Sequence, residues 1–358
     1  MAVRRISPAD AMARLDEFDA LIDARSESEY AEDRLPGAVN WPSLNDEERH
    51  AVGTEYKQVS PFAARKRGAA LVARNIARHI ETHAQNLPRE WKPLVYCWRG
   101  GQRSGSLALV LDQIGFTVHS LEGGYVGFRR AVVATLETQP QGFAWRVLCG
   151  RTGSAKSRLL QALRAEGAQV LDLEALACHR GSVLGPLPDK PQPSQKAFET
   201  QIWRALHQMD PARPVFAECE SRTIGRLRVP ERLLECLRAG TCVRVEMPLD
   251  ARVDFLIQDY DHLVQDAESL CRTLLSLREL RGADTVARWQ AMARGGEFAA
   301  LVHELLSQHY DPGYMKSIQR NFAGFDSAPV LDLADAGPLT LAQSARTLIA
   351  LSPQASPA

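Results

Sequence analysis

Residues 146–157 read Arg-Val-Leu-Cys-Gly-Arg-Thr-Gly-Ser-Ala-Lys-Ser. The apolar start, the loop of small residues and the amphipathic run after it predict a strand, a tight loop and a helix. The loop matches the phosphate-binding pattern Gly-x-x-x-x-Gly-Lys-Ser except at its last glycine, where this chain has Ala155. In that pattern backbone N–H groups surround phosphates, the lysine reaches their oxygens and the serine hydroxyl binds Mg²⁺.

The expected phosphate contacts are the loop residues Gly150, Thr152, Gly153, Ser154, Ala155, Lys156 and Ser157, and Ser157 is also the expected Mg²⁺ ligand. Ala155 weakens the case for nucleotide hydrolysis, because alanine tolerates fewer backbone conformations than glycine. Further acidic groups for a Mg²⁺ site end a second apolar strand, where Glu218 and Glu220 flank a cysteine. We expect only one of these two to face the phosphates. Asp172 and Glu174 are weaker candidates at the end of the preceding strand.

A second loop, residues 96–104, reads Tyr-Cys-Trp-Arg-Gly-Gly-Gln-Arg-Ser. It places Cys97 between an apolar strand and a helix whose N-terminus supplies partial positive charge, and Arg99 and Arg103 add full charges. This setting, with Gly100 and Gly101 in the turn, favours a nucleophilic thiolate or a sulfur that carries a persulfide. An inert cysteine at a strand end is the alternative. The other six cysteines are irregularly spaced without Cys-x-x-Cys, and we expect them to be small buried hydrophobes in a reducing compartment.

The rest of the chain alternates strands and helices, which predicts the α/β class with parallel sheets. The expected strands are 19–23, 93–97, 117–121, 146–149, 168–172, 215–218 and 241–246, and the expected helices are 71–83, 104–114, 126–136 and 156–166. A polar linker at 137–142 separates a first domain, 1–137, from a phosphate-loop α/β domain, 143–248. A helical C-terminal region, 249–351, follows, with helices at 252–266, 269–281, 285–294 and 298–310. The Pro/Ser/Ala-rich tail, 352–358, is expected to be disordered.

The charge balance excludes a strongly basic nucleic-acid-binding protein. Lys plus Arg number 43 and Asp plus Glu number 43, so any contact with RNA must come from local patches. No apolar run approaches the roughly 20 residues that span a bilayer, and no apolar segment follows the first two arginines. We therefore expect a cytoplasmic protein with no membrane partner.

The first domain resembles the rhodanese family. The resemblance rests on residues 23–25 (Asp-Ala-Arg) with Glu29, on 35–42 (Leu-Pro-Gly-Ala-Val-Asn-Trp-Pro), on the Cys97 loop and on 122–125 (Glu-Gly-Gly-Tyr). It implies that Cys97 carries a persulfide or perselenide held by the loop amides. Rhodanese-like phosphatases have a comparable cysteine loop, usually one residue longer, and are the competing interpretation of this domain.

The chain as a whole resembles the tRNA 2-selenouridine synthases over about residues 15–325. The matching segments are 98–104, 170–182, 192–199 and 218–225. The resemblance implies that a wobble 2-thiouridine of tRNA is first alkylated with geranyl diphosphate and that selenium from selenophosphate then displaces the alkylated sulfur. On this view Cys97 and Lys156 are catalytic, Mg²⁺ assists at the phosphate loop, and His179, Arg180 and Arg222 contact phosphate or tRNA. The implied partners are tRNA and an enzyme that supplies selenophosphate.

Two other functions fit parts of the sequence. One is a kinase or nucleoside triphosphatase with a regulatory rhodanese module, for which the phosphate loop alone would carry the activity. The other is a plain sulfurtransferase with an inert second domain, which Ala155 favours and the strand-loop-helix context of Lys156 opposes.

Overall fold

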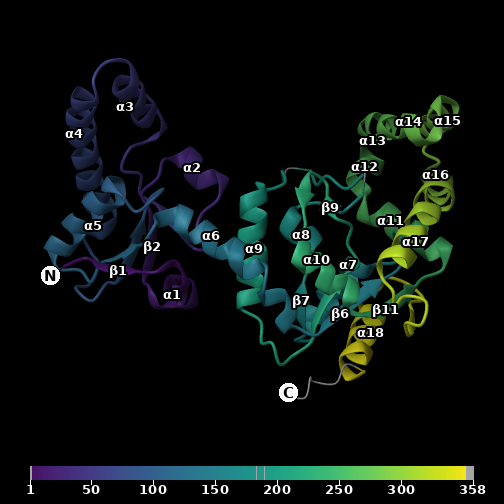
Figure 1. Cartoon of the computed structure of the whole chain (residues 1–358). Helices are drawn as coiled ribbons and strands as arrows, with labels where there is room; N and C mark the ends of the chain where they lie inside the picture. Colours follow the sequence, from purple (N-terminus) through teal and green to yellow (C-terminus); the bar gives the residue numbers. More distant parts are fainter. Residues whose placement is uncertain (1, 183, 189, 352–358) are drawn as a thin grey trace. The chain divides into compact units, whose positions relative to one another are not determined.

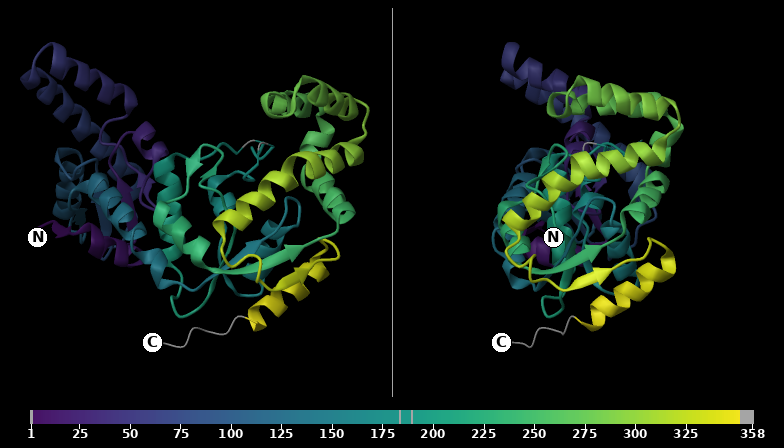
Figure 2. Two further views of the ribbon diagram at one scale, coloured as in Figure 1. Left: turned by 45° about the vertical axis from the view of Figure 1, so that its right-hand side comes forward. Right: turned by 90° about the vertical axis from the view of Figure 1, so that its right-hand side faces the viewer.

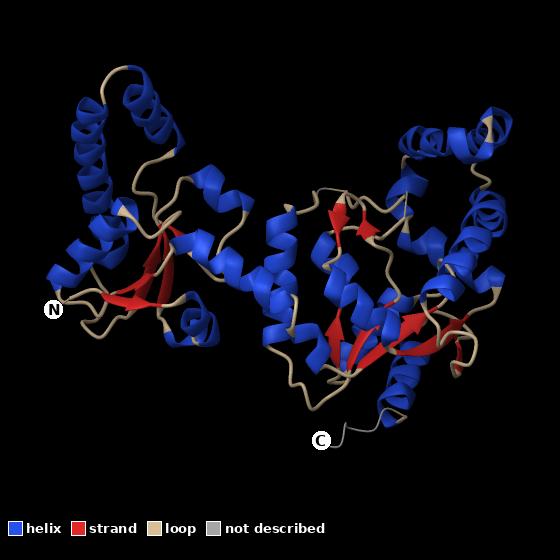
Figure 3. Cartoon of the chain, in the orientation of Figure 1, coloured by secondary structure: helices blue, strands red, loops and turns tan. Residues whose placement is uncertain are grey.

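A computed structural model describes residues 2–182, 184–188 and 190–351. The chain forms two compact units, one of Met1–Thr135 with Pro193–Arg204 and one of Leu136–Gln192 with Ala205–Ala358. Each contains a five-stranded sheet whose described strand pairs are all parallel, with helices packed around it (Figures 1 and 3). The predicted α/β class with parallel sheets is therefore confirmed.

The sheet of unit 1 has the strand order β1-β5-β4-β2-β3. Its strands are β1 (Arg4–Ile6), β2 (Ala20–Asp23), β3 (Val39–Asn40), β4 (Pro93–Tyr96) and β5 (His119–Leu121). All four residues of the central strand β4 are buried, as the continuous apolar run in its sequence requires of a parallel strand covered on both faces. The short strands β1 and β3 lie at the sheet edges and were not predicted.

The helices of unit 1 are α1 (Pro8–Ala13), α2 (Glu27–Glu32), α3 (Asp46–Gln58), α4 (Pro61–His79), α5 (Gln102–Ile114) and α6 (Gly124–Leu136), whose last residue is counted with unit 2. Leu107, Ala108 and Leu111 of α5 are fully buried in the core beside β4. The helix expected at 71–83 is longer than predicted, because it begins at Pro61, capped by the Ser60 side chain, and continues as a π-helical turn over Ile80–Ala84. Its partner α3 packs along it to form a helical hairpin (Figures 1 and 2).

The sheet of unit 2 has the order β12-β11-β6-β8-β7. Its strands are β6 (Trp145–Cys149), β7 (Gln169–Leu171), β8 (Val215–Glu218), β11 (Thr241–Glu246) and β12 (Val330–Asp332), and β9 (Thr223–Ile224) pairs with β10 (Leu227–Arg228) in a separate antiparallel ribbon. The strand β12 lies within the region expected to be helical, so that expectation was wrong at this point. Only three residues long, it is stabilised by parallel pairing with β11, which no local pattern reveals.

The helices of unit 2 near the sheet are α7 (Lys156–Ala165), α8 (Leu173–Ala177), α10 (Glu231–Ala239), α11 (Leu249–Asp259), α17 (Asp311–Asn321) and α18 (Pro338–Ala350). Leu159, Leu160 and Leu163 of α7 share one core with Leu341 and Leu348 of α18. Further helices are α12 (Asp261–Gln265), α13 (Ala267–Leu274), α14 (Arg278–Arg281), α15 (Ala283–Arg294) and α16 (Phe298–Glu304), with a π-helical turn over Leu305–Tyr310. Trp289 is fully buried at the centre of their own core.

The helix α9 (Gln195–His207) contributes to both units, because Pro193–Arg204 belong to unit 1 and Ala205 begins the next part of unit 2. The sequence division placed all of these residues in the second domain, and it separated the C-terminal helices that the structure counts within unit 2. The tail expected to be disordered, 352–358, lies outside the described residues. Among the described residues, no helix has both the length and the apolar character needed to cross a bilayer.

Candidate active site

Cys97 directly follows β4, whose last residue pairs with Asp23 at the end of β2. Its side chain is 3% exposed and lies at the start of α5. The backbone N–H of Gly101 donates to Cys97 Sγ over 3.3 Å, and Ser104 Oγ donates to the same sulfur over 3.1 Å. These two hydrogen bonds fix the position of the sulfur at the start of α5. The loop therefore holds Cys97 as a candidate nucleophile or chalcogen carrier.

The first turn of α6 fastens the cysteine loop from the other side. Tyr125 N–H donates to Cys97 O over 2.8 Å, and Val126 N–H donates to Trp98 O over 3.0 Å. Gly124 has φ +57°, and a Cβ atom there would lie 2.2 Å from Cys97 O. Only glycine fits this position. Trp98, for which the sequence left base stacking and packing open, lies with its ring centroid 5.5 Å from that of Tyr125.

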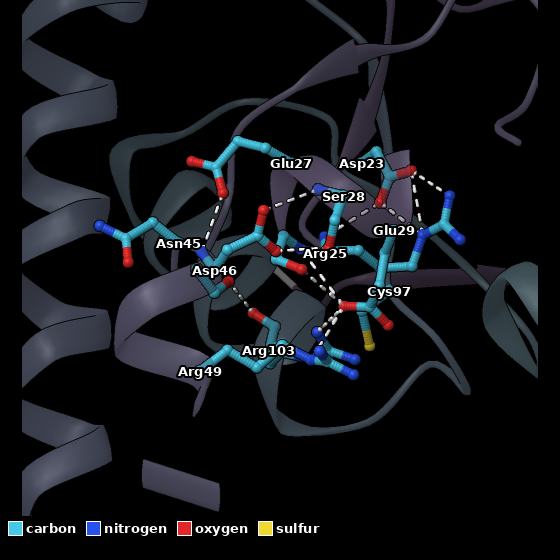
Figure 4. Close-up of polar contacts among 12 residues, drawn as sticks. Asp23, Arg25, Glu27, Ser28, Glu29, Asn45, Asp46, Arg49, Cys97 and Arg103 are labelled. Atoms are coloured by element: carbon cyan, nitrogen blue, oxygen red, sulfur yellow. Dashed lines mark hydrogen bonds and ion pairs between the residues drawn. The ribbon is translucent and has the colours of Figure 1, made fainter. Parts of the chain in front are cut away.

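The guanidinium of Arg103 is paired with a carboxylate of the same unit. Its Nη1 donates to Glu29 Oε2 over 2.7 Å, and Arg49 Nε lies 3.2 Å from the same oxygen (Figure 4). Burial alone would raise the pKa of Glu29, but the contact with Arg103 outweighs it and the pKa is lowered. Arg103 therefore does not add a full positive charge beside Cys97, as the sequence had led us to expect, because Glu29 neutralises its guanidinium. Arg99 is exposed and has no hydrogen bond or ion pair with another described residue.

The phosphate loop joins β6 to α7, as predicted. Lys156 is 8% exposed, and its Nζ donates to Gly150 O over 2.9 Å and to Arg151 O over 3.0 Å. The ammonium group also lies 5.4 Å from the ring centroid of Tyr314. Because its ammonium group binds carbonyls of the loop itself, Lys156 is placed to bind the oxygens of a phosphate in the loop instead.

Two backbone positions explain the shape of this loop. A Cβ atom on Gly150 would lie 2.4 Å from Val245 O, so the loop can leave β6 at this point only with glycine. Ala155 adopts the left-handed conformation, with φ +54° and ψ +25°, at the position where the usual pattern has its last glycine. The alanine therefore keeps the glycine conformation of the loop and is strained in it.

Arg252 of α11 anchors the middle of the loop. It is 2% exposed, its Nε donates to Thr152 O over 2.9 Å, and its two Nη atoms bind the Asp311 carboxylate over 2.9 and 2.7 Å. This bidentate ion pair ties α11 to the start of α17 and fixes the Thr152 carbonyl between them.

Three carboxylates meet beside Ser157 of the loop. One oxygen from each of Glu174, Glu218 and Glu220 lies within 4.8 Å of the others, and Ser157 Oγ donates to Glu174 Oε2 over 3.2 Å. Burial raises the pKa of Glu174 to about 7, with Lys156 opposing the rise, and burial together with Glu174 raises the pKa of Glu218 and of Glu220 well above the usual range. Buried acids this close cannot all ionise without a cation.

These groups fit a hard divalent cation. Glu218 is 7% exposed, and its Oε1 has no hydrogen-bond partner among the described residues. Carboxylate and hydroxyl oxygens are the ligands that Mg²⁺ prefers. Ser157, Glu174, Glu218 and Glu220 could therefore hold Mg²⁺ next to Lys156.

A cavity of about 540 Å³ lies over the phosphate loop and the carboxylates. A second pocket, with an almost entirely apolar lining, shares Thr152, Ser182, Leu256, Tyr260 and Tyr310 with that cavity. Its remaining lining residues include Leu263 and Leu270 of the C-terminal helices, together with Phe298, Leu301 and Leu305. Unit 2 thus places a polar cavity at the phosphate loop next to an apolar pocket.

Comparison with known proteins agrees with this arrangement. Residues 143–277 match the family model of the tRNA 2-selenouridine synthase AAA domain, and residues 7–131 match the rhodanese-like domain. The tRNA 2-selenouridine synthases of Chromohalobacter salexigens and Alcanivorax borkumensis are 34% and 31% identical to this chain, over 84% of it in both cases and over 88% and 90% of their own lengths. This chain belongs to the tRNA 2-selenouridine synthase family.

Another member of the family, the tRNA 2-selenouridine synthase of Nitrosomonas europaea, is 37% identical over 67% of this chain and 63% of its own length. Among solved structures, the N-terminal domain of a protein described as ATP/GTP-binding from Clostridium difficile 630 is 32% identical over 37% of this chain, with a TM-score of 0.31. A rhodanese-related protein from Thermoplasma volcanium is 18% identical over 36% of this chain, with a TM-score of 0.24.

Most phosphate-loop predictions meet at the cavity. Its lining includes Thr152, Gly153, Ser154, Ala155, Lys156, Ser157, His179, Arg180, Glu218 and Glu220. Glu218 and Glu220 both face it, so the expectation that only one would do so was wrong: they stand two positions apart, and the two-residue period of a strand puts such residues on the same face. Arg180 faces the cavity already paired with Asp259, while His179 is 6% exposed and its Nδ1 accepts from Gly181 N–H over 3.1 Å. Arg222 is outside the lining and pairs with Glu231 on the surface.

The sequence interpretation missed several residues of the site. Arg252 and Tyr314 come from helices about 100 and 160 residues beyond the loop, so no local pattern connects them to it. Glu174 was ranked as a weak candidate, yet it joins Glu218 and Glu220 because β7 lies beside β8 in the sheet. The shared strand end was the signal that could have placed it.

Proposed function

We propose that this chain converts wobble 2-thiouridine in tRNA to 2-selenouridine in two steps, using geranyl diphosphate and then selenophosphate. Membership of a family whose relatives are named tRNA 2-selenouridine synthase supports a tRNA substrate. An alkylated sulfur leaves a carbon centre far more readily than an unactivated thiocarbonyl sulfur does. The first step therefore prepares the second.

The observation that carries the geranyl diphosphate part is the apolar pocket next to the phosphate loop. A prenyl diphosphate has a charged head that suits Lys156 and the loop amides and a ten-carbon tail that suits a pocket lined by leucine and phenylalanine. The tail contributes through burial of apolar surface, roughly 25 cal/mol per Å². The pocket is a reason to prefer a prenyl diphosphate over a nucleotide.

In the first step the 2-thio sulfur of the uridine attacks C1 of the geranyl group. A C–S bond forms, the C1–O bond breaks, diphosphate leaves with its electrons and the uridine loses its N3 proton. Lys156 and the loop N–H groups bind the charge that develops on the leaving diphosphate. Mg²⁺ at Ser157 and the three glutamates would supply further charge neutralisation there.

In the second step a C–Se bond forms at C2 of the base with selenium from selenophosphate, the C2–S bond breaks and geranylthiol leaves, while water takes the phosphoryl group as phosphate and N3 regains its proton. Cys97 is the side chain that we assign to selenium handling, because its sulfur accepts hydrogen bonds from Gly101 and Ser104 in a preorganised loop. Hydrogen bonds from the first turn of α6 hold two carbonyls of this loop in place.

The test is mass spectrometry of nucleosides from tRNA incubated with the chain, geranyl diphosphate and selenophosphate. We expect Lys156→Ala to abolish geranylthio- and selenouridine, and Cys97→Ser to abolish selenouridine while geranylthiouridine accumulates. Cys236→Ser, a half-buried thiol on α10, is the matched control and should leave both products unchanged.

If the unsubstituted chain forms neither modified nucleoside, the proposal is refuted. Turnover of ATP or GTP that survives Cys97→Ser, without modified nucleosides, would instead identify a nucleoside triphosphatase with a regulatory rhodanese module. Selenouridine formed by Cys97→Ser would remove that residue from the mechanism.

A further inference from the structure

The helical hairpin of α3 and α4 carries the densest positive charge in unit 1. The 19 residues of α4, Pro61–His79, include Arg65, Lys66, Arg67, Arg74 and Arg78 and no acidic residue. All five of these cationic side chains are exposed. In a chain whose net charge is +0, such a concentration is a local feature and not a consequence of composition.

Three of the arginines form a line along α4. Arg67, Arg74 and Arg78 are separated by seven and four residues, which places them on one side of the helix over a length of about 16 Å. Arg67 Nη1 contacts Glu55 of α3 over 3.3 Å, whereas Arg74 and Arg78 have no ion pair with a described residue. Their charges are therefore available to an external anion.

A neighbouring side of α4, about a quarter turn around the helix from this line, packs against its partner helix. Gly68 is buried, and a Cβ atom there would lie 3.4 Å from Val52 Cγ1 of α3. Asn75 is also buried, and its Nδ2 donates to Ser43 O and to Glu48 Oε2. The two helices run side by side (Figures 1 and 2), and the arginines are exposed beside the packed side of α4.

The tip of the hairpin adds aromatic surface to the charge. Tyr56 at the end of α3 is 47% exposed and Phe62 at the start of α4 is 68% exposed. Lys66 Nζ lies 5.0 Å from the ring centroid of Phe62. Exposed rings among cations are the combination with which proteins stack unpaired bases and hold the phosphates beside them.

We infer that the α3–α4 hairpin is a docking surface for RNA, with Arg74 and Arg78 on backbone phosphates and the Tyr56–Phe62 tip against unpaired bases. The inference rests on the proposed function, in which tRNA is the substrate, and it names the surface of unit 1 that receives it. The charge complementarity decides for RNA: Arg74 and Arg78 are exposed, have no ion pair with a described residue and lie on a helix with no acidic residue, so they match a polyphosphate chain.

The test measures affinity of the full-length chain for bulk tRNA as a function of salt concentration. Arg74→Ala with Arg78→Ala should lower the slope of log affinity against log salt by about 2 and weaken binding roughly tenfold or more at about 0.1 M salt. Phe62→Ala should weaken binding with the salt slope unchanged. The helix should remain folded, because alanine is the best helix former.

The control is Arg5→Ala with Arg130→Ala, which removes the same charge from two exposed positions of unit 1. If the hairpin pair and the control pair bind tRNA equally, the docking surface is refuted while the proposed function stands. If the unsubstituted chain binds no tRNA, the proposed function and the docking surface both fall.

Discussion

At the scale of single residues, Ala155 combines an unfavourable backbone conformation with the favourable burial of its methyl group. A left-handed alanine costs roughly 1–2 kcal/mol relative to the right-handed form. Its methyl group is buried, at 3% exposure, and a buried carbon of this size contributes about 0.8 kcal/mol. A glycine would relieve the strain but would also gain about 0.4–1 kcal/mol of unfolded-state entropy.

These terms nearly cancel, so we predict that Ala155→Gly changes the unfolding free energy by less than about 1 kcal/mol. Ala162, in the right-handed interior of the same helix α7, is the matched control, and Ala162→Gly should destabilise by about 1 kcal/mol or more. Urea unfolding followed by tryptophan fluorescence compares the two. A loss at position 155 as large as that at 162 would mean that Ala155 is not strained.

At the scale of elements, the ends of β7 and β8 concentrate acidic groups that the metal-free fold does not satisfy. Glu218 Oε1 is buried without a partner among the described residues, and its neighbours Glu174 and Glu220 carry the same charge. Burial raises the pKa of all three, which shows that the folded chain resists their ionisation. Such a cluster lowers the free energy of unfolding, and a cation that binds the folded chain would raise it.

We therefore predict that Glu218→Gln raises the melting temperature at neutral pH in the absence of Mg²⁺, since it removes a carboxyl group that must take up a proton when the chain folds, and reduces the rise that Mg²⁺ causes. Scanning calorimetry in a chelator and in millimolar Mg²⁺ gives both quantities. Glu279→Gln, at an exposed carboxylate of α14, should change neither. An unaltered Mg²⁺ response in Glu218→Gln would exclude this carboxylate from the metal site.

The elements that sequence predicted best are those whose pattern is local. The strands at 93–97 and 215–218 are found as β4 and β8 within one residue, because each is an uninterrupted apolar run. The prediction of a helix at 71–83 missed residues 61–70, with which the helix begins. These residues are mainly small and basic and show weak apolar periodicity. The strand β12 and the helix α18 form through contacts with β11 and α7, which a pattern along the chain does not contain.

The same division holds for the candidate site. Both loops were placed correctly because strand, loop and helix are consecutive, as at Cys97 and Lys156. The partner of Arg103 lies 74 residues away, and that of the Thr152 carbonyl lies 100 residues away. Contacts over such separations depend on the tertiary fold, so the ion pair with Glu29 and the anchoring role of Arg252 became visible only in the structure.

At the scale of the whole molecule, α9 carries one chain of contacts that ends at the cysteine loop. Thr200 Oγ1 donates to Asp33 Oδ2 over 3.0 Å, and Tyr125 Oη donates to the same oxygen over 2.8 Å. The backbone N–H of Tyr125 in turn binds Cys97 O. A segment inserted between two parts of the phosphate-loop unit therefore supports the loop that holds the Cys97 sulfur.

Arg129 of α6 is the main charged contact to this segment. It forms an ion pair with Glu199, and its Nη1 donates to Lys196 O and to Thr200 Oγ1 over 3.3 Å.

We predict that Arg129→Ala speeds amide hydrogen exchange in residues 196–204 of the full-length chain about tenfold, equivalent to about 1.4 kcal/mol, because partly buried charged hydrogen bonds are lost. Exchange mass spectrometry should show no such change for Arg130→Ala, the exposed neighbour on the same helix. Equal exchange in both variants would mean that other contacts, such as the ion pair of Lys196 with Glu32 and the ring contact of Phe128 with Trp203, hold α9 in unit 1. Faster exchange confined to Arg129→Ala would establish that α9 is held by charge, and the cysteine loop would then depend on an ion pair supplied from outside the rhodanese-like sequence.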